Sequence, residues 1–222
     1  MTTMSSRARG GICASGAPCR KPPCACYNPL GTNRGGFVVR EALVASTSIR
    51  RATYDDAREI AEVHVESWRS TYGGIIDQAF IDGLSVAERA VSWMRRLSMS
   101  SLAASDVLVA TTLDGSIVGF LSGGVIRAPY LEFDAELHAI YLLESVQRAG
   151  LGRRLTREWA AIAITRGLHA AVVRAHADNP ACAFYERLGA EFLRTSQVDI
   201  GGKPYPERWY GWRDLPALAG IV

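Results

Sequence analysis

The chain has 222 residues, of which 48% are hydrophobic, and a formal net charge of +3 at pH 7. This length and apolar content suit one globular domain with an appendage. The run of about 18 apolar residues that a membrane-spanning helix needs is absent, so no membrane span is expected.

The first 47 residues differ in composition from the rest of the chain. They hold four of the five cysteines and four of the nine prolines. Six Arg and Lys residues against one Glu give this segment a net charge of +5, which leaves −2 for residues 48–222. The basic balance therefore belongs to the appendage, which argues against a nucleic-acid-binding domain. We expect residues 1–47 to be a disordered extension and residues 48–222 to form the folded domain.

The cysteines of the extension, Cys13, Cys19, Cys24 and Cys26, leave one alternative open. Their spacing could in principle ligate zinc, but it lacks a C-x2-C pair and a nearby His, so we favour no metal. A redox or metal switch in this segment stays the minority hypothesis. A secretory signal would need a continuous apolar core, which the segment lacks. With only Cys182 in the domain, a reducing cytoplasm fits.

The elements of the domain follow from caps and periodicity. A short strand is expected at 48–52, and Thr53-x-x-Asp56 resembles the start of a helix that continues to Tyr72. Ser85-x-x-Glu88 is a capping box for a second helix. Trp93 and His64 lie on apolar helix faces and are interpreted as core residues.

The second half reads as strands broken by two helices. Asp114-Gly115 predicts a hairpin of strands 106–113 and 117–125. A strand at 136–143, a helix at 151–165, a strand at 170–173 and a helix through Tyr185 follow, and Gly201-Gly202 predicts a last hairpin. This order predicts an α/β (α+β) fold with a mixed sheet of about seven strands flanked by helices.

A glycine-containing loop, Gln147–Arg153, lies between the strand at 136–143 and the next helix. Gly150 and Gly152 let backbone N–H groups approach a ligand, and the helix start adds free donors suited to a diphosphate. The order Gln-x-x-Gly-x-Gly is neither the Walker nor the dinucleotide fingerprint. It resembles the acyl-CoA pyrophosphate loop of the GNAT superfamily of N-acyltransferases. The segment Asp178–Ala190, with Asn, Phe-Tyr and a closing Gly, resembles the second GNAT signature.

The resemblance implies a GNAT fold and acetyl-CoA as co-substrate. In this family the strand before the loop splays from its neighbour and pairs its backbone with pantetheine, and the Leu142 N–H is then the natural oxyanion donor. The residues expected to bind the cofactor are Ile140, Tyr141, Leu142, Gln147, Arg148, Ala149, Gly150, Leu151, Gly152, Arg153, Asn179 and Tyr185. For the strand residues, a simple core strand is the alternative.

Tyr185 occupies the position of the family's general acid, which returns a proton to the CoA thiolate. The family's cofactor-contacting Asn lies seven residues before this Tyr, whereas Asn179 lies six before it and Asp178 seven. We assign the contact to Asn179, although Asn-Pro would serve equally well as a helix cap.

Glu136 lies in the register of the family's catalytic glutamate and is the candidate base, with His138 on the same face of the strand. Either could accept a proton, through water if necessary. The alternative is that Glu136 pairs with a neighbouring strand and His138 only lines the cleft.

The acceptor pocket is expected from the first helices and the last hairpin. Trp68, Arg69, Tyr72 and His138 are the candidate substrate-binding residues. Tyr205, Glu207 and Trp209 are candidates on the hairpin. We interpret Cys182 as a packed thiol rather than an acyl-carrying nucleophile, because no His is placed to activate it.

These features predict a cytoplasmic N-acetyltransferase that acetylates a primary amine by direct attack through a tetrahedral intermediate. A small-molecule acceptor is favoured, with no nucleic-acid or membrane partner, and the resemblance allows a homodimer. A protein or peptide α-amine acceptor and a non-catalytic acyl-CoA sensor are the alternatives.

Overall fold

A seven-stranded mixed sheet lies at the centre of the domain. The computed structural model describes residues 44–98 and 105–221, which all belong to the second of two compact units, residues 35–222. The strands run in the spatial order β1-β2-β3-β4-β5-β7-β6, and the mixed sheet of seven strands flanked by helices is as predicted. Their bounds are β1 Ser48–Arg51, β2 Ser105–Thr111, β3 Ile117–Tyr130, β4 Phe133–Leu142, β5 Ala171–His176, β6 Glu191–Ile200 and β7 Lys203–Trp212.

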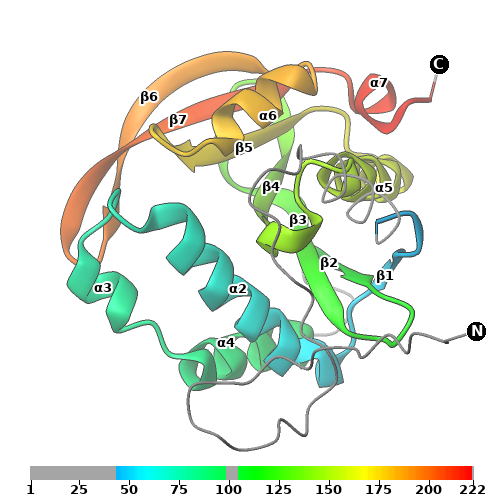
Figure 1. Ribbon diagram of the computed structural model, residues 1–222. Helices are drawn as coiled ribbons and strands as arrows, with labels where there is room; N and C mark the ends of the chain where they lie inside the picture. The colour runs from blue at the N-terminus through cyan, green and yellow to red at the C-terminus, as the bar shows by residue number, and fades with distance from the viewer. Residues whose placement is uncertain (1–43, 99–104, 222) are drawn as a thin grey trace, which may run out of the picture. The chain divides into compact units, whose positions relative to one another are not determined.

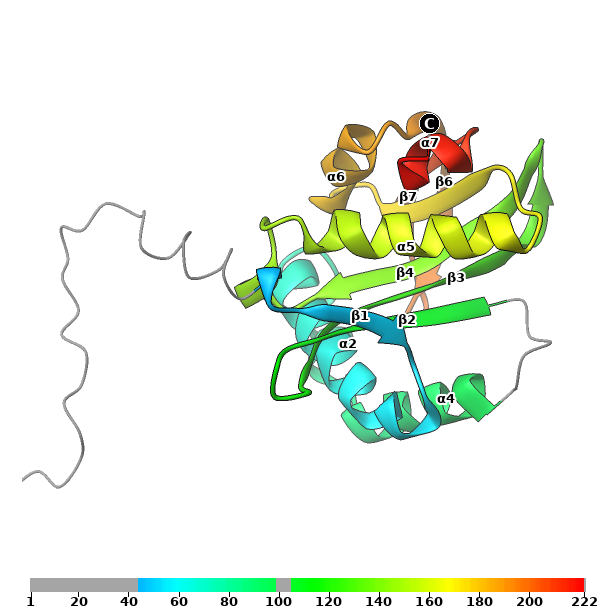
Figure 2. The ribbon, with the colours of Figure 1, turned by 90° about the vertical axis from the view of Figure 1, so that its right-hand side faces the viewer.

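Helices cover both faces of this sheet. Their bounds are α2 Ala57–Tyr72, α3 Gln78–Asp82, α4 Val86–Ser98, α5 Leu151–Thr165, α6 Ala181–Arg187 and α7 Leu215–Ala219, with 3-10 turns η1 Tyr54–Asp56 and η2 Glu144–Val146. Figure 2 shows α5 on one side of β1–β4 and α2 with α4 on the other. In Figure 1, β6 and β7 bend around toward α3.

The predicted helix starts are confirmed by their hydrogen bonds. The Thr53 N–H donates to the Asp56 carboxylate at 2.7 Å, and the Ser85 Oγ accepts from the Glu88 N–H at 3.3 Å. Two short helices, α3 and α7, were not predicted. Each has five residues and is stabilised at its start by an aspartate, Asp77 or Asp214, so neither is long enough to show helical periodicity.

The core forms two layers on either side of the sheet. On one side, Ile60 and Trp93 of α2 and α4 pack against Phe120 of β3. On the other, Leu155 and Trp159 of α5 are fully buried. The indole of Trp159 lies so close to Gly123 of β3 that a Cβ there would be 2.5 Å from it, so this position requires a glycine.

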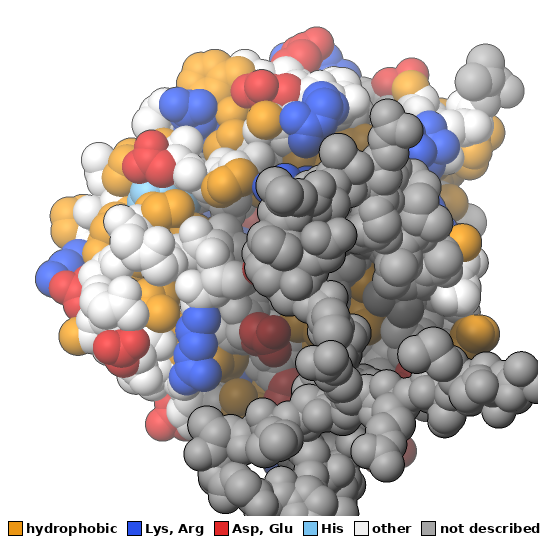
Figure 3. Space-filling model, in the orientation of Figure 1, with side chains coloured by type: hydrophobic (Ala, Val, Ile, Leu, Met, Phe, Trp, Pro, Cys, Tyr) orange, Lys and Arg blue, Asp and Glu red, His pale blue; other side chains and the backbone are white. Residues whose placement is uncertain are grey.

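The surface of the described residues carries mixed charge. Basic and acidic side chains lie interspersed with apolar ones on the face shown in Figure 3. Among the helices that the structure describes, none is long and apolar enough to cross a membrane.

The feature that shapes the site is the early end of the β4–β5 ladder. In these parallel strands, only residues 135–137 of β4 pair with a β5 residue, and their partners are residues 171–173. Beyond this point β4 continues to Leu142 while paired with β3 alone. The second half of β4 therefore has one edge without a neighbouring strand.

Candidate functional site

The open edge of β4 presents the backbone of Ile140 and Leu142. The Leu143 N–H donates to the Val118 carbonyl on β3 at 3.0 Å, so alternation along the strand directs the N–H and C=O groups of Leu142 and Ile140 away from β3. The Leu142 carbonyl accepts from the Gln147 side chain at 2.9 Å and from the Ser67 hydroxyl at 3.3 Å. Ser67 is a residue that the sequence did not single out.

The loop between β4 and α5 has backbone geometry suited to an anion. Arg148 and Gly150 adopt positive φ values of 64° and 86°, and α5 then begins at Leu151 with no side chain capping its first N–H groups. Successive amides in such a turn point toward one side and form a concave donor surface. The Phe184 ring lies 3.2 Å from where a Cβ of Gly152 would be, so α6 packs tightly on the start of α5.

Asn179 uses both ends of its side-chain amide within the protein. Its Oδ1 accepts from the Ala181 N–H at 2.8 Å, as expected of the cap of α6. Its Nδ2 donates to the Tyr72 hydroxyl at 2.7 Å. Asn179 therefore binds the first N–H group of α6, although Pro180 is the residue that directly precedes the helix, and the contact with Tyr72 could not be predicted from the sequence.

Three predicted site residues, Trp68, Tyr72 and Tyr141, meet in one aromatic cluster. The Trp68 indole N–H donates to the Tyr141 hydroxyl at 2.8 Å, and the Trp68 and Tyr72 rings lie 4.8 Å apart. Tyr72 and Tyr141 pack in the same apolar cluster, whereas Tyr185 lies in the main core, where its ring is 6.0 Å from that of Trp212. Burial is the main cause that raises the pKa of each of these three tyrosines, so all are protonated at neutral pH.

Glu136 lies at the opposite end of β4 from this cluster and is buried among arginines. Its carboxylate binds Arg127 on both oxygens and accepts from the Arg174 guanidinium at 2.9 Å. Burial raises the pKa of Glu136, but the hydrogen bonds and charges of Arg127 and Arg174 outweigh it and lower the pKa to about 2. A carboxylate this weakly basic is a poor match for a proton acceptor at neutral pH.

His138 is buried beside Glu136 with one free nitrogen. Its Nε2 lies 3.9 Å from the Glu136 carboxylate and has no hydrogen-bond partner among the described residues. Burial, and then the charge of Arg127, lower the pKa of His138 to about 4, so its imidazole is neutral at neutral pH. His176 of β5, a residue that the sequence did not single out, also has a buried Nε2 without a described partner.

The remaining acceptor candidates are spread over two places. The Tyr205 hydroxyl accepts from the Asp77 N–H at 2.9 Å, and its ring lies 5.6 Å from that of His176. Glu207 and Trp209 belong instead to the arginine cluster, where the Arg174 guanidinium stacks over the Trp209 ring. Arg69 points away from the tyrosines and donates to the Leu84 carbonyl at 3.1 Å.

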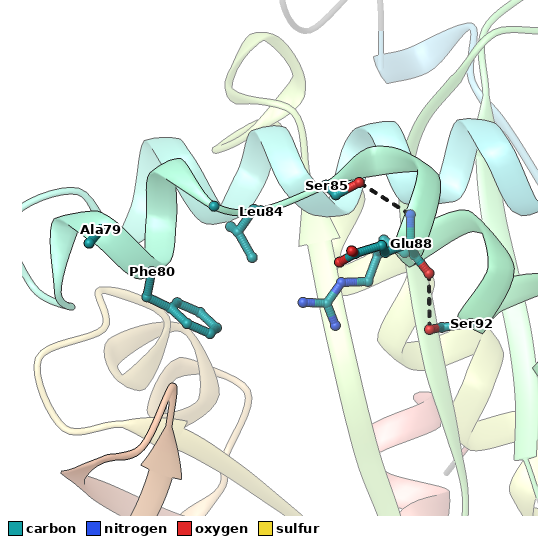
Figure 4. A pocket seen from close by; sticks show the side chains of 8 residues that line it. Ala79, Phe80, Leu84, Ser85, Glu88 and Ser92 are labelled. Atoms are coloured by element: carbon teal, nitrogen blue, oxygen red, sulfur yellow. Dashed lines mark hydrogen bonds between the residues drawn. The ribbon is translucent and has the colours of Figure 1, made fainter.

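A pocket lies between α3 and α4, next to the aromatic cluster of Trp68, Tyr72 and Tyr141. Figure 4 shows Phe80 and Leu84 directed into it, with Ser85 and Glu88 at the start of α4. The Phe80 ring is 5.9 Å from that of Trp68. The pocket therefore adjoins the aromatic cluster from the α3 side.

Metal ligation has no candidate in the part of the chain that the structure describes, where no group of three His, Cys, Asp or Glu side chains is suitably placed. Cys182 is buried, its thiol contacts the His176 carbonyl at 3.5 Å, and burial raises its pKa, as expected of a packed thiol. The cysteines of the extension lie outside the described residues.

The open strand edge, the loop of residues 147–153 and the Asn179–Tyr185 segment all lie within a stretch with a clear family likeness. A profile of the acetyltransferase (GNAT) family matches residues 80–190. The N-acetyltransferase YuaI of Bacillus subtilis, itself uncharacterized, is 36% identical over 175 residues, which cover 79% of this chain and 98% of YuaI. The chain belongs to the GNAT family.

Two further comparisons agree with this assignment. A spermidine N(1)-acetyltransferase of Thermoplasma acidophilum is 27% identical over 161 residues, 70% of this chain and 94% of that protein. The crystal structure of the PaiA N-acetyltransferase of the same organism, in complex with coenzyme A, superposes with a TM-score of 0.57 at 22% identity, covering 73% and 98% of the two chains. The 222-residue chain is therefore an acyl-transferring enzyme of the GNAT family, and acetyl-CoA is its co-substrate.

Proposed function

We propose that this GNAT enzyme transfers the acetyl group of acetyl-CoA to the primary amine of a small molecule by direct attack. The observation that carries the proposal is the open edge of β4, which ends beside the anion-binding loop. Together they offer backbone partners for the pantetheine arm and donors for the diphosphate.

The cofactor is proposed to bind along this edge. The backbone groups of Ile140 and Leu142, on either side of Tyr141, would pair with pantetheine, and the Leu142 N–H would stabilise the oxyanion of the tetrahedral intermediate. The N–H groups from Arg148 to Arg153, with the guanidinium groups of Arg148 and Arg153, would hold the diphosphate. The Gln147 side chain supports this arrangement indirectly, because it binds the Leu142 carbonyl.

In the reaction proposed at this site, the amine loses one proton and the departing sulfur gains one, so no net proton is taken up or released. The neutral amine attacks the thioester carbonyl, the C–N bond forms, and the tetrahedral intermediate collapses with cleavage of the C–S bond. Tyr185, protonated at neutral pH, donates to the departing sulfur, while the ammonium proton passes to His138 or Glu136 through water. The unpartnered Nε2 of neutral His138 supports His138 over Glu136, whose lone pairs are occupied by two arginines.

A small acceptor is proposed to enter from the side of α3. Trp68, Tyr72 and Tyr205 are proposed to line this approach, because they pack in one apolar cluster with Phe80, which also lines the pocket of Figure 4. A peptide α-amine is the second candidate acceptor. A cytoplasmic location is proposed from the single cysteine of the domain.

The test is mass-detected acetyl transfer from acetyl-CoA to a pooled panel of amino acids, polyamines, aminoglycosides and short peptides. Wild-type protein should acetylate at least one small amine. Tyr185→Phe should lower kcat by a factor of about 10² or more, the usual effect of removing a general acid. Stabilisation by acetyl-CoA without any product would favour the sensor alternative instead.

A further inference from the structure

Arg96 of α4 is held against the sheet without a carboxylate partner. Its guanidinium donates to the Ser122 hydroxyl of β3 at 3.1 Å and lies 5.0 Å from the centre of the Trp93 ring. Both partners are buried and uncharged, whereas Arg96 itself is exposed. Among residues 44–98 and 105–221, no carboxylate forms an ion pair with Arg96. A guanidinium has five N–H donors, so most of those of Arg96 are available to a ligand.

The Arg96 guanidinium reaches the sheet beside His138, the residue proposed to accept the proton of the amine. Its partner Ser122 pairs with Ala139 of β4, and the register then shifts, so that His138 is an extra residue in β4 at this point. The His138 imidazole lies 3.9 Å from the Glu136 carboxylate. A positive charge without a partner is therefore close to the proposed site of proton transfer.

Glu136 and Arg96 lie on the same face of the sheet. A Cβ on Gly123 of β3 would meet Trp159 of α5, so Gly123 faces the α5 side. The next residue, Gly124, faces the α4 side, because side chains alternate along a strand. Glu136 is the residue opposite Gly124 and shares its face. The charged groups around Glu136 and the guanidinium of Arg96 therefore belong to one surface.

The carboxylates of this surface are already paired. Glu136 accepts hydrogen bonds from Arg127 at 3.0 Å and from Arg174 at 2.9 Å. Glu207 accepts from the Ser196 hydroxyl at 2.7 Å and lies 3.9 Å from Arg174. Neither carboxylate is available to bind a second ammonium group of an acceptor.

Glu88 is the acidic residue of α4, and it lies at the other end of the helix from Arg96. It lines the pocket between α3 and α4 together with Arg89, which offsets its charge there. Eight residues of helix separate Glu88 from Arg96, a distance of about 12 Å along the axis. This exceeds the Debye length of about 8 Å at physiological salt, so Glu88 repels an anion at Arg96 only weakly.

We propose that the acceptor of this enzyme is an amine that also carries an anionic group, a carboxylate or a phosphate, and that Arg96 binds this group. The inference rests on the proposed function, because it takes β4 as the place of acetyl transfer. An oxyanion can accept two parallel N–H bonds from one guanidinium, and such charge-assisted bonds are stronger than neutral ones. A polyamine would instead bring a second positive charge to an arginine that has no partner.

The pairing of β3 with β4 sets the length of the acceptor. Ser122, which binds Arg96, is opposite Ala139, and the proposed oxyanion donor Leu142 lies three residues further along β4. At about 3.4 Å per residue, this separation is about 10 Å. A hydrogen bond at each end takes up about 3 Å, which leaves about 4 Å between the amine and the acid group. A chain of a few bonds, as in 4-aminobutanoate or 2-aminoethyl phosphate, spans this distance.

The first experiment compares amines of matched length and different charge. The wild-type protein is given acetyl-CoA with 4-aminobutanoate, 2-aminoethyl phosphate, 4-aminobutanamide or 1,4-diaminobutane, and the product is detected by mass. We expect kcat/KM for one of the two anionic amines to exceed that for the amide and the diamine by roughly tenfold or more, the effect of a hydrogen bond to a charged group. The better of the two distinguishes a carboxylate from a phosphate acceptor. A preference for the amide or the diamine would overturn the proposal.

Arg96→Gln tests the residue, with Arg95→Gln as the matched control. Arg95 is an exposed arginine of the same helix, so its replacement removes the same charge from a neighbouring position. Arg96→Gln should lower kcat/KM for the preferred anionic amine roughly tenfold or more, mainly through its KM, with unchanged affinity for acetyl-CoA and an unchanged melting temperature. Arg95→Gln should behave like the wild type. Equal losses in the two variants would overturn the assignment of Arg96 and indicate a general effect of charge.

A binding measurement separates this inference from the proposed function. The Nε–H signal of Arg96, assigned by its loss in Arg96→Gln, is followed by NMR in protein saturated with coenzyme A while each of the three charged amines is added. A saturable shift with 4-aminobutanoate or 2-aminoethyl phosphate that 1,4-diaminobutane does not cause supports the anion site. The absence of a shift with both anionic amines overturns it. If the shift occurs but no amine is acetylated, the proposed function fails and the anion site stands.

Discussion

At the scale of single residues, the neighbours of Glu136 decide what its carboxylate can do. Arg127 and Arg174 stabilise its charged form, and the pKa of Glu136 is lowered from 4.5 to about 2. A lowered pKa in the folded state means that this carboxylate stabilises the protein above pH 4.5. That contribution is lost as the pH falls from 4.5 toward 2.

Glu136→Gln should therefore act mainly on stability. We expect the free energy of unfolding at pH 7 to fall by about 1.5–3 kcal/mol, the range for hydrogen bonds to charged groups, with a flatter pH dependence between pH 4.5 and 2. Urea denaturation at a series of pH values measures both. Glu62→Gln, which breaks only the exposed Arg58–Glu62 pair, is the control and should cost well under 1 kcal/mol. A large loss of acetyl transfer with unchanged stability would instead identify Glu136 as the base.

Residue types were easier to predict than residue partners. The sequence indicated Asn179 as a cap because a cap is a local feature, within two residues of the N–H that it binds. Its second contact, with Tyr72, joins residues 107 positions apart and depends on how α2 packs against the sheet. The same limit applies to Ser67, which reaches the Leu142 carbonyl, and to the arginines around Glu136. No spacing along the chain contains this information.

At the scale of elements, the loop before α5 has a backbone conformation that favours glycine at Gly150, and it is the proposed binding site of the diphosphate. Gly150 has a φ of 86°, where an L-residue costs roughly 1–2 kcal/mol. Gly150→Ala should lower stability by about this amount and, because the amides of the loop shift, weaken the binding of acetyl-CoA. Calorimetric titration and thermal melting measure the two effects.

A matched control for this variant is Gly115→Ala in the β2–β3 turn. Gly115 has a φ of 89° and open space around it, so an alanine there causes backbone strain similar to that of Gly150→Ala. The loop before α5 is not changed by this variant. We expect the same loss of stability with unchanged affinity for acetyl-CoA. Equal affinities in the two variants would argue against a cofactor role for the loop.

The elements themselves were largely predictable, for identifiable reasons. Asp114-Gly115 and Gly201-Gly202 marked two of the three hairpins among the described residues, β2–β3 and β6–β7, and alternation or helical spacing marked the longer strands and helices. β3 and β4 extend beyond the predicted ends to Tyr130 and Phe133, where the turn passes through Leu131 at a φ of 49°. A leucine is not a turn signal, so the hairpin of β3 and β4 could not be predicted from the sequence.

At the scale of the whole molecule, the N-terminal boundary of the domain can be tested. The Val44 side chain is buried in the core below α5. The Arg154 guanidinium donates to the carbonyls of Val44 and Thr47 at 2.9 and 3.0 Å. These contacts lie before residue 48, where composition had suggested that the domain begins.

A protein spanning residues 44–222 should therefore be more stable than one spanning 48–222. Burial of one valine stabilises by up to about 1.5–3 kcal/mol, to which the two Arg154 hydrogen bonds add. Urea midpoints of the two proteins measure the difference, with acetyl transfer as a check that both are folded. Identical midpoints would show that Val44 contributes nothing and that the boundary at 48 is adequate.

The contact between α3 and the tip of the β6–β7 hairpin has a dynamic consequence. Asp77 caps α3 and forms an ion pair with Lys203, and its N–H donates to the Tyr205 hydroxyl. The Phe80 ring lies against Gly201. The start of α3 and the β6–β7 turn, more than 120 residues apart in sequence, are thus joined by contacts in one small region. Local unfolding of either must release the other, so the amides of both should exchange with deuterium at one common rate. If the acceptor passes between α3 and the β6–β7 hairpin, their joint opening is required for each turnover, and the opening rate sets an upper limit on kcat.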